Sequence, residues 1–360
     1  MKTCCSVITG TGSYLPLEEI PNQAFIDRVF YDNNGNATDR GNKEVIEKFQ
    51  EITTIARRRY VTKDVLNSDI GFFAAEEAIH SASIDREEID YIIFAHNFGD
   101  VRHDGPGGEM VPALASRVKN RLQIKNPYTV AYDLPFGCPG WLQGIIQADY
   151  FLKSGDADKI LVIGADTLSR IADPHDRDSM IYADGAGAVI LEAADASPGS
   201  GVLGHKTRSD TFSEVDLLHM DRTNNPDSDD ARLYLKMDGR KVYQYAVKTV
   251  PALIKTCLEQ CNIGINEVNK VLIHQANGKM DDAMLVRLFK LYGLAPADIP
   301  EHIMPMTVSW LGNSSVATLP TLLDLLVKKK LSPHTIEQGD ILVFASVGAG
   351  MNANCVIYRV

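Results

Sequence analysis

The chain has 360 residues, of which 45% are hydrophobic and 23% charged, so it can bury a large core and lacks the composition of a disordered protein. Its formal net charge of −11 speaks against a broad basic face for nucleic acid or a membrane surface. No apolar run approaches the ~20 residues that a membrane span needs, and Met1 to Cys5 lead into a strand without a signal-peptide core. We therefore expect a cytoplasmic protein that binds neither nucleic acid nor a membrane.

The cysteine pattern argues against a metal site. Cys257 and Cys261 lie one helical turn apart, but no second pair of ligands accompanies them, so zinc is not expected. The sequence also predicts no bound cofactor. The six cysteines are Cys4, Cys5, Cys138, Cys257, Cys261 and Cys355, and those in apolar strands suggest buried thiols in a reducing compartment.

The N-terminal part contains two weak motifs. A short strand over residues 6–9 precedes Gly10-Thr11-Gly12, but the third glycine of a dinucleotide-binding fingerprint is replaced by Leu15. Residues 17–62 are expected to be mostly helical and polar, and they end in Arg57-Arg58-Arg59. This basic run, like Lys328-Lys329-Lys330, could meet a phosphate or an acidic partner, although such runs are more often solvated faces.

Two stretches of the chain repeat the same pattern. A helix over residues 70–82 is followed by a buried strand over 91–95, and a helix over 250–261 is followed by a strand over 271–273. Residues 158–163 match residues 339–344 in the same way. Helices that alternate with continuous apolar strands indicate sheets covered on both faces. We therefore predict a duplicated α/β fold with halves at residues 1–192 and 193–360.

The stretch Gly137-Cys138-Pro139-Gly140 joins an extended run over residues 128–132 to a helical pattern over 141–152. Pro139 suits a first helical turn. Cys138 would then lie at the helix N-terminus, where free backbone N–H groups favour a thiolate. Taken alone, Cys138 would more often be a small buried residue at a tight turn.

Three later segments carry matching polar groups. The apolar strand over 271–273 ends in His274, Asn313 lies in a Gly-Asn turn before an apolar helix, and the strand over 341–347 runs into Gly348-Ala349-Gly350. Singly, His274 would more often be a core histidine and Asn313 a turn residue or helix cap. Together with Cys138 they fit an activated nucleophile with polar partners.

These motifs, in this order, resemble the β-ketoacyl-acyl-carrier-protein synthase III family of thiolase-like condensing enzymes, nearly from end to end. The shared motifs are Gly-Thr-Gly-Ser-Tyr-Leu-Pro (10–16), the Cys138 elbow, Asp-Pro-His-Asp-Arg (173–177), Asp-Gly-Ala-Gly-Ala (184–188), His-Gln-Ala-Asn (274–277), Gly-Asn-Ser-Ser (312–315) and the final glycine turn. The resemblance implies two βαβαβαββ halves in a five-layer αβαβα sandwich. The first half would carry the nucleophile, and the second the His and Asn.

The resemblance also implies the chemistry. Cys138 would take an acyl group from a thioester, and malonyl-acyl-carrier protein would then decarboxylate and attack the acyl-enzyme. His274 and Asn313 match the donors that stabilise the enolate. The backbone N–H groups of Cys138 and Ala349 match the oxyanion hole, although the family commonly has glycine at position 349. A relative that joins longer acyl chains, a cysteine hydrolase and a silent thiolase-fold subunit remain alternatives.

The entrance and the assembly match the family in part. Arg177 and Lys279 align with basic positions near the coenzyme A phosphates. Phe49 stands where the family often has a Trp that stacks on adenine, and Thr53 where it often has an Arg. The expected substrates are thioesters of coenzyme A or of the acyl carrier protein, and a long or unusual acyl donor is favoured over acetyl-coenzyme A.

The resemblance further implies a homodimer. In the family, a loop of one subunit reaches the pocket of its partner, and residues 98–112 match that loop. Glu109 in this loop could abstract a proton, as in non-decarboxylating relatives, or lie in solvent, which we favour.

Overall fold

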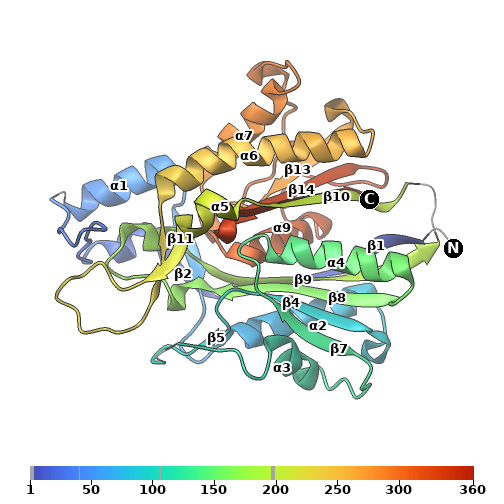
Figure 1. The fold of residues 1–360 in the computed structure, drawn as a ribbon, viewed down its shortest axis with the longest axis horizontal. Coiled ribbons are helices and arrows are strands. Elements are labelled where there is room, and N and C mark those ends of the chain that lie inside the picture. Colours follow the sequence, from blue (N-terminus) through green and yellow to red (C-terminus); the bar gives the residue numbers. More distant parts are fainter. Residues whose placement is uncertain (1–3, 40, 106, 196–198) are drawn as a thin grey trace.

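A computed structural model describes residues 4–39, 41–105, 107–195 and 199–360; Met1 to Thr3 of the expected chain start and Pro106 of the expected crossing loop lie outside them. Two β-sheets organise the fold (Figure 1). The first has the order β1 (Cys4–Tyr14), β9 (Asp184–Asp195), β8 (Lys159–Thr167), β4 (Tyr91–Ala95) and β7 (Val130–Leu134). The second has the order β10 (Gly201–Ser209), β15 (Asn352–Arg359), β14 (Ile341–Gly348) and β13 (Val268–Ile273).

Helices cover both faces of each sheet. The outer face of the first sheet packs on α2 (Asn67–Ala82) and α3 (Leu114–Arg121), and the outer face of the second on α6 (Gly239–Gln260) and α7 (Gly278–Lys290). Between the sheets lie α4 (Gly140–Ser154) and α9 (Thr318–Val327). Figure 1 shows the resulting five layers, which confirms the predicted sandwich.

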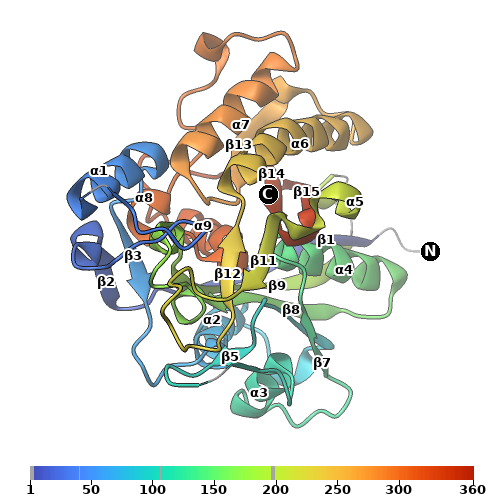
Figure 2. The same ribbon diagram turned by 60° about the vertical axis from the view of Figure 1, so that its left-hand side comes forward.

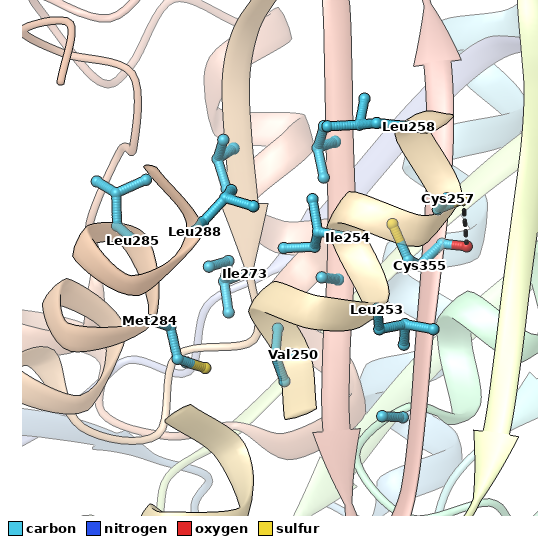
Figure 3. Close-up of a cluster of buried hydrophobic side chains, with 14 of the residues drawn as sticks. Val250, Leu253, Ile254, Cys257, Leu258, Ile273, Met284, Leu285, Leu288 and Cys355 are labelled. Carbon is cyan, nitrogen blue, oxygen red and sulfur yellow. Dashed lines mark hydrogen bonds between the residues drawn. The ribbon is translucent and has the colours of Figure 1, made fainter. Parts of the chain in front are cut away.

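Separate hydrophobic clusters hold these layers together. In the cluster on the outer face of the second sheet, Val250 and Ile254 of α6 and Leu288 of α7 pack near Ile273 at the end of β13 (Figure 3). All four residues are at most 1% exposed, so the burial of each side chain contributes roughly 1.5–3 kcal/mol to the free energy of folding. This packing fixes the end of β13, from which the next residue, His274, projects.

The two halves are similar but not equal. The N-terminal half follows the expected order of strands and helices, with β4, β7 and β8 parallel. In the C-terminal half, residues 301–307 run beside β13, where the Val271 N–H donates to Ile303 O at 2.9 Å. Pro305 in this segment has no N–H for a strand ladder, which explains why a fifth strand does not form there. The division at residues 192 and 193 stays a prediction; β9 continues to Asp195.

The glycine pair near the N-terminus serves packing. Gly10 and Gly12 lie inside β1, and a Cβ atom on either would collide with the backbone of α2 at Ala78 or Ala74. The pair therefore lets α2 approach the sheet closely. Among the described residues, no helix is long and apolar enough to cross a membrane.

A cap of mixed structure lies between β1 and α2 in the chain. It contains the hairpin of β2 (Glu18–Pro21) and β3 (Arg57–Tyr60) besides α1 (Asn42–Thr53), so the expectation of a mostly helical segment is wrong in part. Figure 2 shows this cap beside the short helix α8 (Val308–Leu311).

Of the basic run at the end of the cap, Arg57 is exposed, Arg58 is buried and Arg59 is partly buried. Arg58 is 0% exposed, with its guanidinium 4.8 Å from the ring centre of Phe25. Arg57 and Arg59 both pair with Glu19, at 3.2 and 2.9 Å. Arg58 therefore packs inside the cap, while Arg57 and Arg59 join β3 to β2 through partly exposed ion pairs.

The remaining elements lie in connections. The connection after β10 carries α5 (Thr211–Glu214), β11 (Leu218–Asp221) and β12 (Tyr234–Met237). The crossing loop forms a small hairpin of β5 (Asp100–Val101) and β6 (Gly108–Glu109).

Candidate active site

The predicted catalytic residues lie at the carboxyl ends of strands in both sheets. Cys138 follows β7, His274 directly follows β13, and Gly348 ends β14. In open α/β sheets this edge is where ligands bind. The structure therefore places these motifs at strand ends where a ligand site is expected.

The elbow that carries Cys138 is held on several sides. Gly137 has a φ of +65°, a conformation that glycine adopts at little cost, and its carbonyl accepts the Gly140 N–H at 3.0 Å. Asn354 of β15 donates its side-chain amide to Pro139 O at 3.0 Å. The helix begins at Gly140 with Pro139 as the N-cap, so Cys138 lies just outside α4.

The elbow and the final glycine turn pass in contact. A Cβ atom built on Gly348 would lie 2.6 Å from the backbone nitrogen of Cys138, and one on Gly137 would lie 2.9 Å from the nitrogen of Ala349. The two backbone amides predicted for the oxyanion hole are therefore neighbours. Ala349 is not among the non-glycine residues with a positive φ, so its methyl group causes no backbone strain.

The backbone of Asn313 is clamped by the segment before β9. Its N–H donates to Ile181 O at 3.0 Å, and its carbonyl accepts from the Ala183 N–H at 2.8 Å. The side-chain Oδ1 accepts from the Ser315 N–H at 2.8 Å. Since the oxygen is occupied in this way, the Nδ2 group of Asn313 is the donor available to a ligand.

His274 is buried and neutral. It is 2% exposed, and its backbone N–H donates to Ala345 O of β14 at 2.9 Å. Loss of water around the ring lowers its pKa to about 4, so at neutral pH the imidazole carries no charge. Nδ1 has no hydrogen-bond partner among the described residues.

The neighbouring Gln275 connects this strand to the Asn313 turn, a role that its place in the His-Gln motif did not reveal. Its Oε1 accepts from the Thr307 N–H at 2.7 Å and from the Val308 N–H at 3.1 Å. The segment so anchored leads through α8 to Gly312 and Asn313. Gln275 thereby couples the positions of the two expected enolate donors.

The sulphur of Cys138 has a hydroxyl neighbour. Ser315 Oγ donates to Sγ at 3.4 Å, so one residue contacts both the predicted nucleophile and Asn313. Loss of water raises the pKa of Cys138 to about 11 against the opposing hydrogen bond from Ser315, and the charge of Asp166 acts in the same direction as burial. The sequence predicts a favoured thiolate at this helix end, whereas burial of the sulphur favours the neutral thiol.

Two further residues reach this network without any sequence signal. Asn97 follows β4, and its Nδ2 donates both to Ser315 Oγ at 3.1 Å and to Asp166 of β8 at 2.8 Å. Such partners come from distant segments and cannot be recognised from local spacing.

The predicted entrance residues lie on α1, on α7 and in the turn that begins at Arg177, and they differ in exposure. Lys279, in the first turn of α7, is exposed, and so is Arg177. Phe49 is 9% exposed and belongs to a hydrophobic cluster in the cap that also contains Phe25 and Val45. The Arg58 guanidinium lies 5.8 Å from the ring centre of Phe49. Thr53 donates its hydroxyl to Phe49 O at 2.8 Å. Contacts of these residues with coenzyme A stay predictions.

A buried lysine pairs with the carboxylates of the Asp-Pro-His-Asp-Arg loop (173–177). Lys236 of β12, buried at 6% exposure, forms an ion pair with Asp173 and lies 3.5 Å from Asp176. Asp173 also accepts from the Asn224 N–H at 2.7 Å. The carboxylates of this loop are thus paired with a cation of the chain itself.

Glu109 of the crossing loop is paired on the protein surface. Its carboxylate accepts from Arg102 Nε at 2.7 Å and lies 3.5 Å from Arg117. The hydrogen bond from Arg102 lowers the pKa of Glu109, which makes it a weaker base than a free carboxylate. In this arrangement Glu109 is a structural anion of the hairpin.

Comparison with known proteins identifies relatives along nearly the whole chain. The family models of 3-oxoacyl-[acyl-carrier-protein] synthase III match residues 132–211 and, for its C-terminal part, residues 258–360. The synthase III (FabH) of Pseudomonas aeruginosa PAO1 is 26% identical over 99% of this chain and 98% of its own, with a TM-score of 0.80. The enzyme of Aquifex aeolicus VF5 is 27% identical over 99% and 100%, with a TM-score of 0.78. OleA of Xanthomonas campestris, 18% identical over the full length of both chains with a TM-score of 0.77, shares the fold.

Proposed function

The chain belongs to the 3-oxoacyl-[acyl-carrier-protein] synthase III family of condensing acyltransferases, with its duplicated thiolase-like fold, and we propose that it joins an acyl thioester to malonyl-acyl-carrier protein by a decarboxylating Claisen condensation. The observation that carries this proposal is the position of Cys138. It lies on the elbow before α4, in contact with the final glycine turn and hydrogen-bonded to the residue that orients Asn313.

In the first step Cys138 attacks the carbonyl carbon of the acyl donor. The new S–C bond replaces the thioester bond of the donor, and the thiol proton leaves with the donor's sulphur. Negative charge develops on the carbonyl oxygen, where the adjacent N–H groups of Cys138 and Ala349 are available as donors. Because burial raises the pKa of Cys138 to about 11, attack and loss of the proton are expected to be closely coupled.

In the second step malonyl-acyl-carrier protein loses CO2, and the resulting carbanion attacks the acyl-Cys138 carbonyl and releases the sulphur. The negative charge passes through the malonyl thioester oxygen as an enolate. Neutral His274 and the Nδ2 group of Asn313 are the donors proposed for this oxygen. Neither group carries a charge of its own. The hydrogen bonds that they donate therefore become strong only when negative charge develops on the enolate oxygen.

The test is intact mass spectrometry after incubation with a panel of acyl thioesters. We expect one acyl group on the wild-type chain and none on Cys138→Ala. The matched control is Cys261→Ala, because burial raises the pKa of Cys261 to about 11 as well, yet this residue lies at the far end of α6. Acylation of Cys138→Ala, or its loss in Cys261→Ala, would contradict the assignment.

The same panel tests the acyl donor. We propose a longer or unusual acyl donor rather than acetyl-coenzyme A. Phe49 is nearly buried, so its ring face is not offered to an adenine base. Thr53 is uncharged and donates its hydroxyl to a backbone carbonyl, so it cannot pair with a phosphate as an arginine would. Acetyl-coenzyme A and medium-chain thioesters are offered together, and clear preference for acetyl-coenzyme A would refute this part of the proposal.

We also propose that the protein is a homodimer that receives the acyl carrier protein. The strand β7 lies at the edge of the first sheet, where Tyr128 and Val130 are 85% and 47% exposed. Val111, at the end of the crossing loop, is 90% exposed. An unpaired edge with apolar side chains around it favours pairing with a second copy.

A further inference from the structure

The hydroxyl of Ser315 is held from two sides. It accepts from Asn97 Nδ2 at 3.1 Å and donates to Cys138 Sγ at 3.4 Å. A serine hydroxyl has one hydrogen, and the amide of Asn97 can act there only as donor. The hydrogen of Ser315 is therefore shared between two acceptors, the Cys138 sulphur at 3.4 Å and the carboxylate of Asp166, where a hydrogen bond from Ser315 opposes the rise in pKa that burial causes.

Asn97 is itself fixed by a buried carboxylate. Its backbone N–H donates to Asp166 Oδ1 at 3.0 Å and its Nδ2 to Oδ2 at 2.8 Å. Asp166 is 0% exposed and lies near the end of β8, while Asn97 follows the neighbouring strand β4. Both hydrogens of the Asn97 amide are thus used, one on Asp166 and one on Ser315, which leaves the Ser315 hydroxyl little freedom to turn.

Ser315 also orients the second expected catalytic group. Its N–H donates to Asn313 Oδ1 at 2.8 Å, and its own φ is +54°, a conformation that few non-glycine residues adopt. This backbone conformation brings the N–H to Asn313 while the hydroxyl meets Cys138. The cost of such a conformation is consistent with a function at this position.

We propose that Ser315 is a positioning residue that donates a hydrogen bond to the Cys138 sulphur as the thiolate forms, and that Asn97 and Asp166 hold it in place. This inference rests on the proposed function, in which Cys138 is the nucleophile. Ser315 keeps its own proton throughout; the thiol proton leaves with the departing thiolate of the acyl donor. A hydrogen bond to the charged form favours that form, and so opposes the desolvation of the sulphur.

Other ionisable groups around Cys138 act differently. Asp166 disfavours the thiolate through its charge, and burial raises the pKa of Asp166 itself. Tyr182, next to the Asn313 turn, is buried, and loss of water raises its pKa well above the ordinary value, so it stays neutral. His274 is neutral as well. Among these described neighbours, Ser315 is the hydroxyl that donates to the sulphur.

The test measures thiolate formation at Cys138 directly. The absorbance of the thiolate at about 240 nm is titrated with pH for wild-type, Ser315→Ala and Ser314→Ala proteins, each corrected with its own Cys138→Ala version. The rate constant of iodoacetamide alkylation at Cys138 is followed over the same pH range. Ser314→Ala is the matched control, since this neighbouring hydroxyl lies 3.4 Å from Thr318 Oγ1.

We expect the titration of Ser315→Ala to move toward higher pH and its alkylation to slow about tenfold at each pH below the midpoint, as the loss of one hydrogen bond to a charged group implies. Ser314→Ala should follow the wild type. Asn97→Ala, which keeps the hydroxyl but removes its anchor, should change in the same direction by a smaller factor. It also tests the inference if Ser315→Ala fails to fold.

Two outcomes separate this inference from the proposed function. If Cys138 is acylated but Ser315→Ala and Asn97→Ala titrate like the wild type, the positioning role is refuted and the nucleophile stands. If Cys138 is not acylated by any thioester, the proposed function fails, whatever the titration shows. A further readout is decarboxylation of malonyl-coenzyme A, which Ser315→Ala should largely retain because its backbone N–H still orients Asn313.

Discussion

The buried state of His274 predicts a specific dependence of stability on pH. Its pKa is lowered by loss of water from 6.5 to about 4, so below pH 6.5 the unfolded chain takes up a proton that the folded chain does not. This contribution to stability is therefore complete above pH 6.5 and is lost as the pH falls toward 4. At about 1.4 kcal/mol per pKa unit, the loss reaches roughly 3 kcal/mol, of which about 2 kcal/mol accrues between pH 7.5 and 5.

The perturbation is His274→Gln, which keeps a polar group but cannot become protonated. We expect the free energy of unfolding, measured with urea at one fixed protein concentration, to fall by about 2 kcal/mol less in the variant than in the wild type between these two pH values. The control is His219→Gln, because His219 is exposed. If His274→Gln and wild type lost the same free energy, His274 would not be a desolvated neutral imidazole, and its role as an uncharged enolate donor would lose its basis.

Three further outcomes follow from the site and its edge. His274→Ala and Asn313→Ala should each slow malonyl decarboxylation about 100- to 1000-fold, more than they slow acylation, in stopped assays of CO2 release; a block of acylation alone would reassign His274 as a base for Cys138. Gly137→Ala should reduce acyl-enzyme formation at least about tenfold by mass spectrometry, because the added Cβ would lie only 2.9 Å from the Ala349 nitrogen and because residue 137 has a positive φ. Acylation at the wild-type rate would argue against an oxyanion hole at this position. Sedimentation at micromolar concentration should give a dimer, and a fully active monomer would contradict it.

The repeated pattern of the chain was sufficient to predict the layers. The strand expected over 91–95 is β4, and the apolar residues after Cys138 form the buried face of α4 between the sheets. Continuous apolar strands leave few alternatives, because both faces must be covered. The boundaries were less accessible: α6 begins at Gly239 and continues through Pro251, whereas the pattern indicated a helix from 250. Buried neighbours such as Val250 and Ile254 hold the helix across this proline.

The sequence predicted only those residues of the candidate site that follow a strand or a turn. Cys138, His274 and Asn313 each follow a recognisable strand or turn, so their type and place could be inferred. Asn97 and Ser315 are 218 residues apart and meet because β4 and the turn before α9 converge. An asparagine after a strand has many possible partners, and its sequence neighbours do not indicate which one it finds. Exposure is equally non-local, which is why Arg58 was expected in solvent but lies buried between aromatic rings.

The same loss of water explains two pKa changes of opposite sign in the site. It raises the pKa of Cys138 to about 11 and lowers that of His274 to about 4, and in both cases it favours the neutral form. A site with a neutral thiol and a neutral imidazole lacks the ion pair of a cysteine protease, but it suits a reaction in which charge appears only transiently on thioester oxygens. Backbone amides and the Asn313 amide can stabilise such charge without any cation of their own, while the Ser315 hydroxyl donates to the sulphur. The proposed condensation discharges the acyl group to a carbon nucleophile that arises within the site. A water molecule would find only a weak base in His274, because the pKa of the imidazole is lowered to about 4 and its Nδ1 has no hydrogen-bond partner among the described residues.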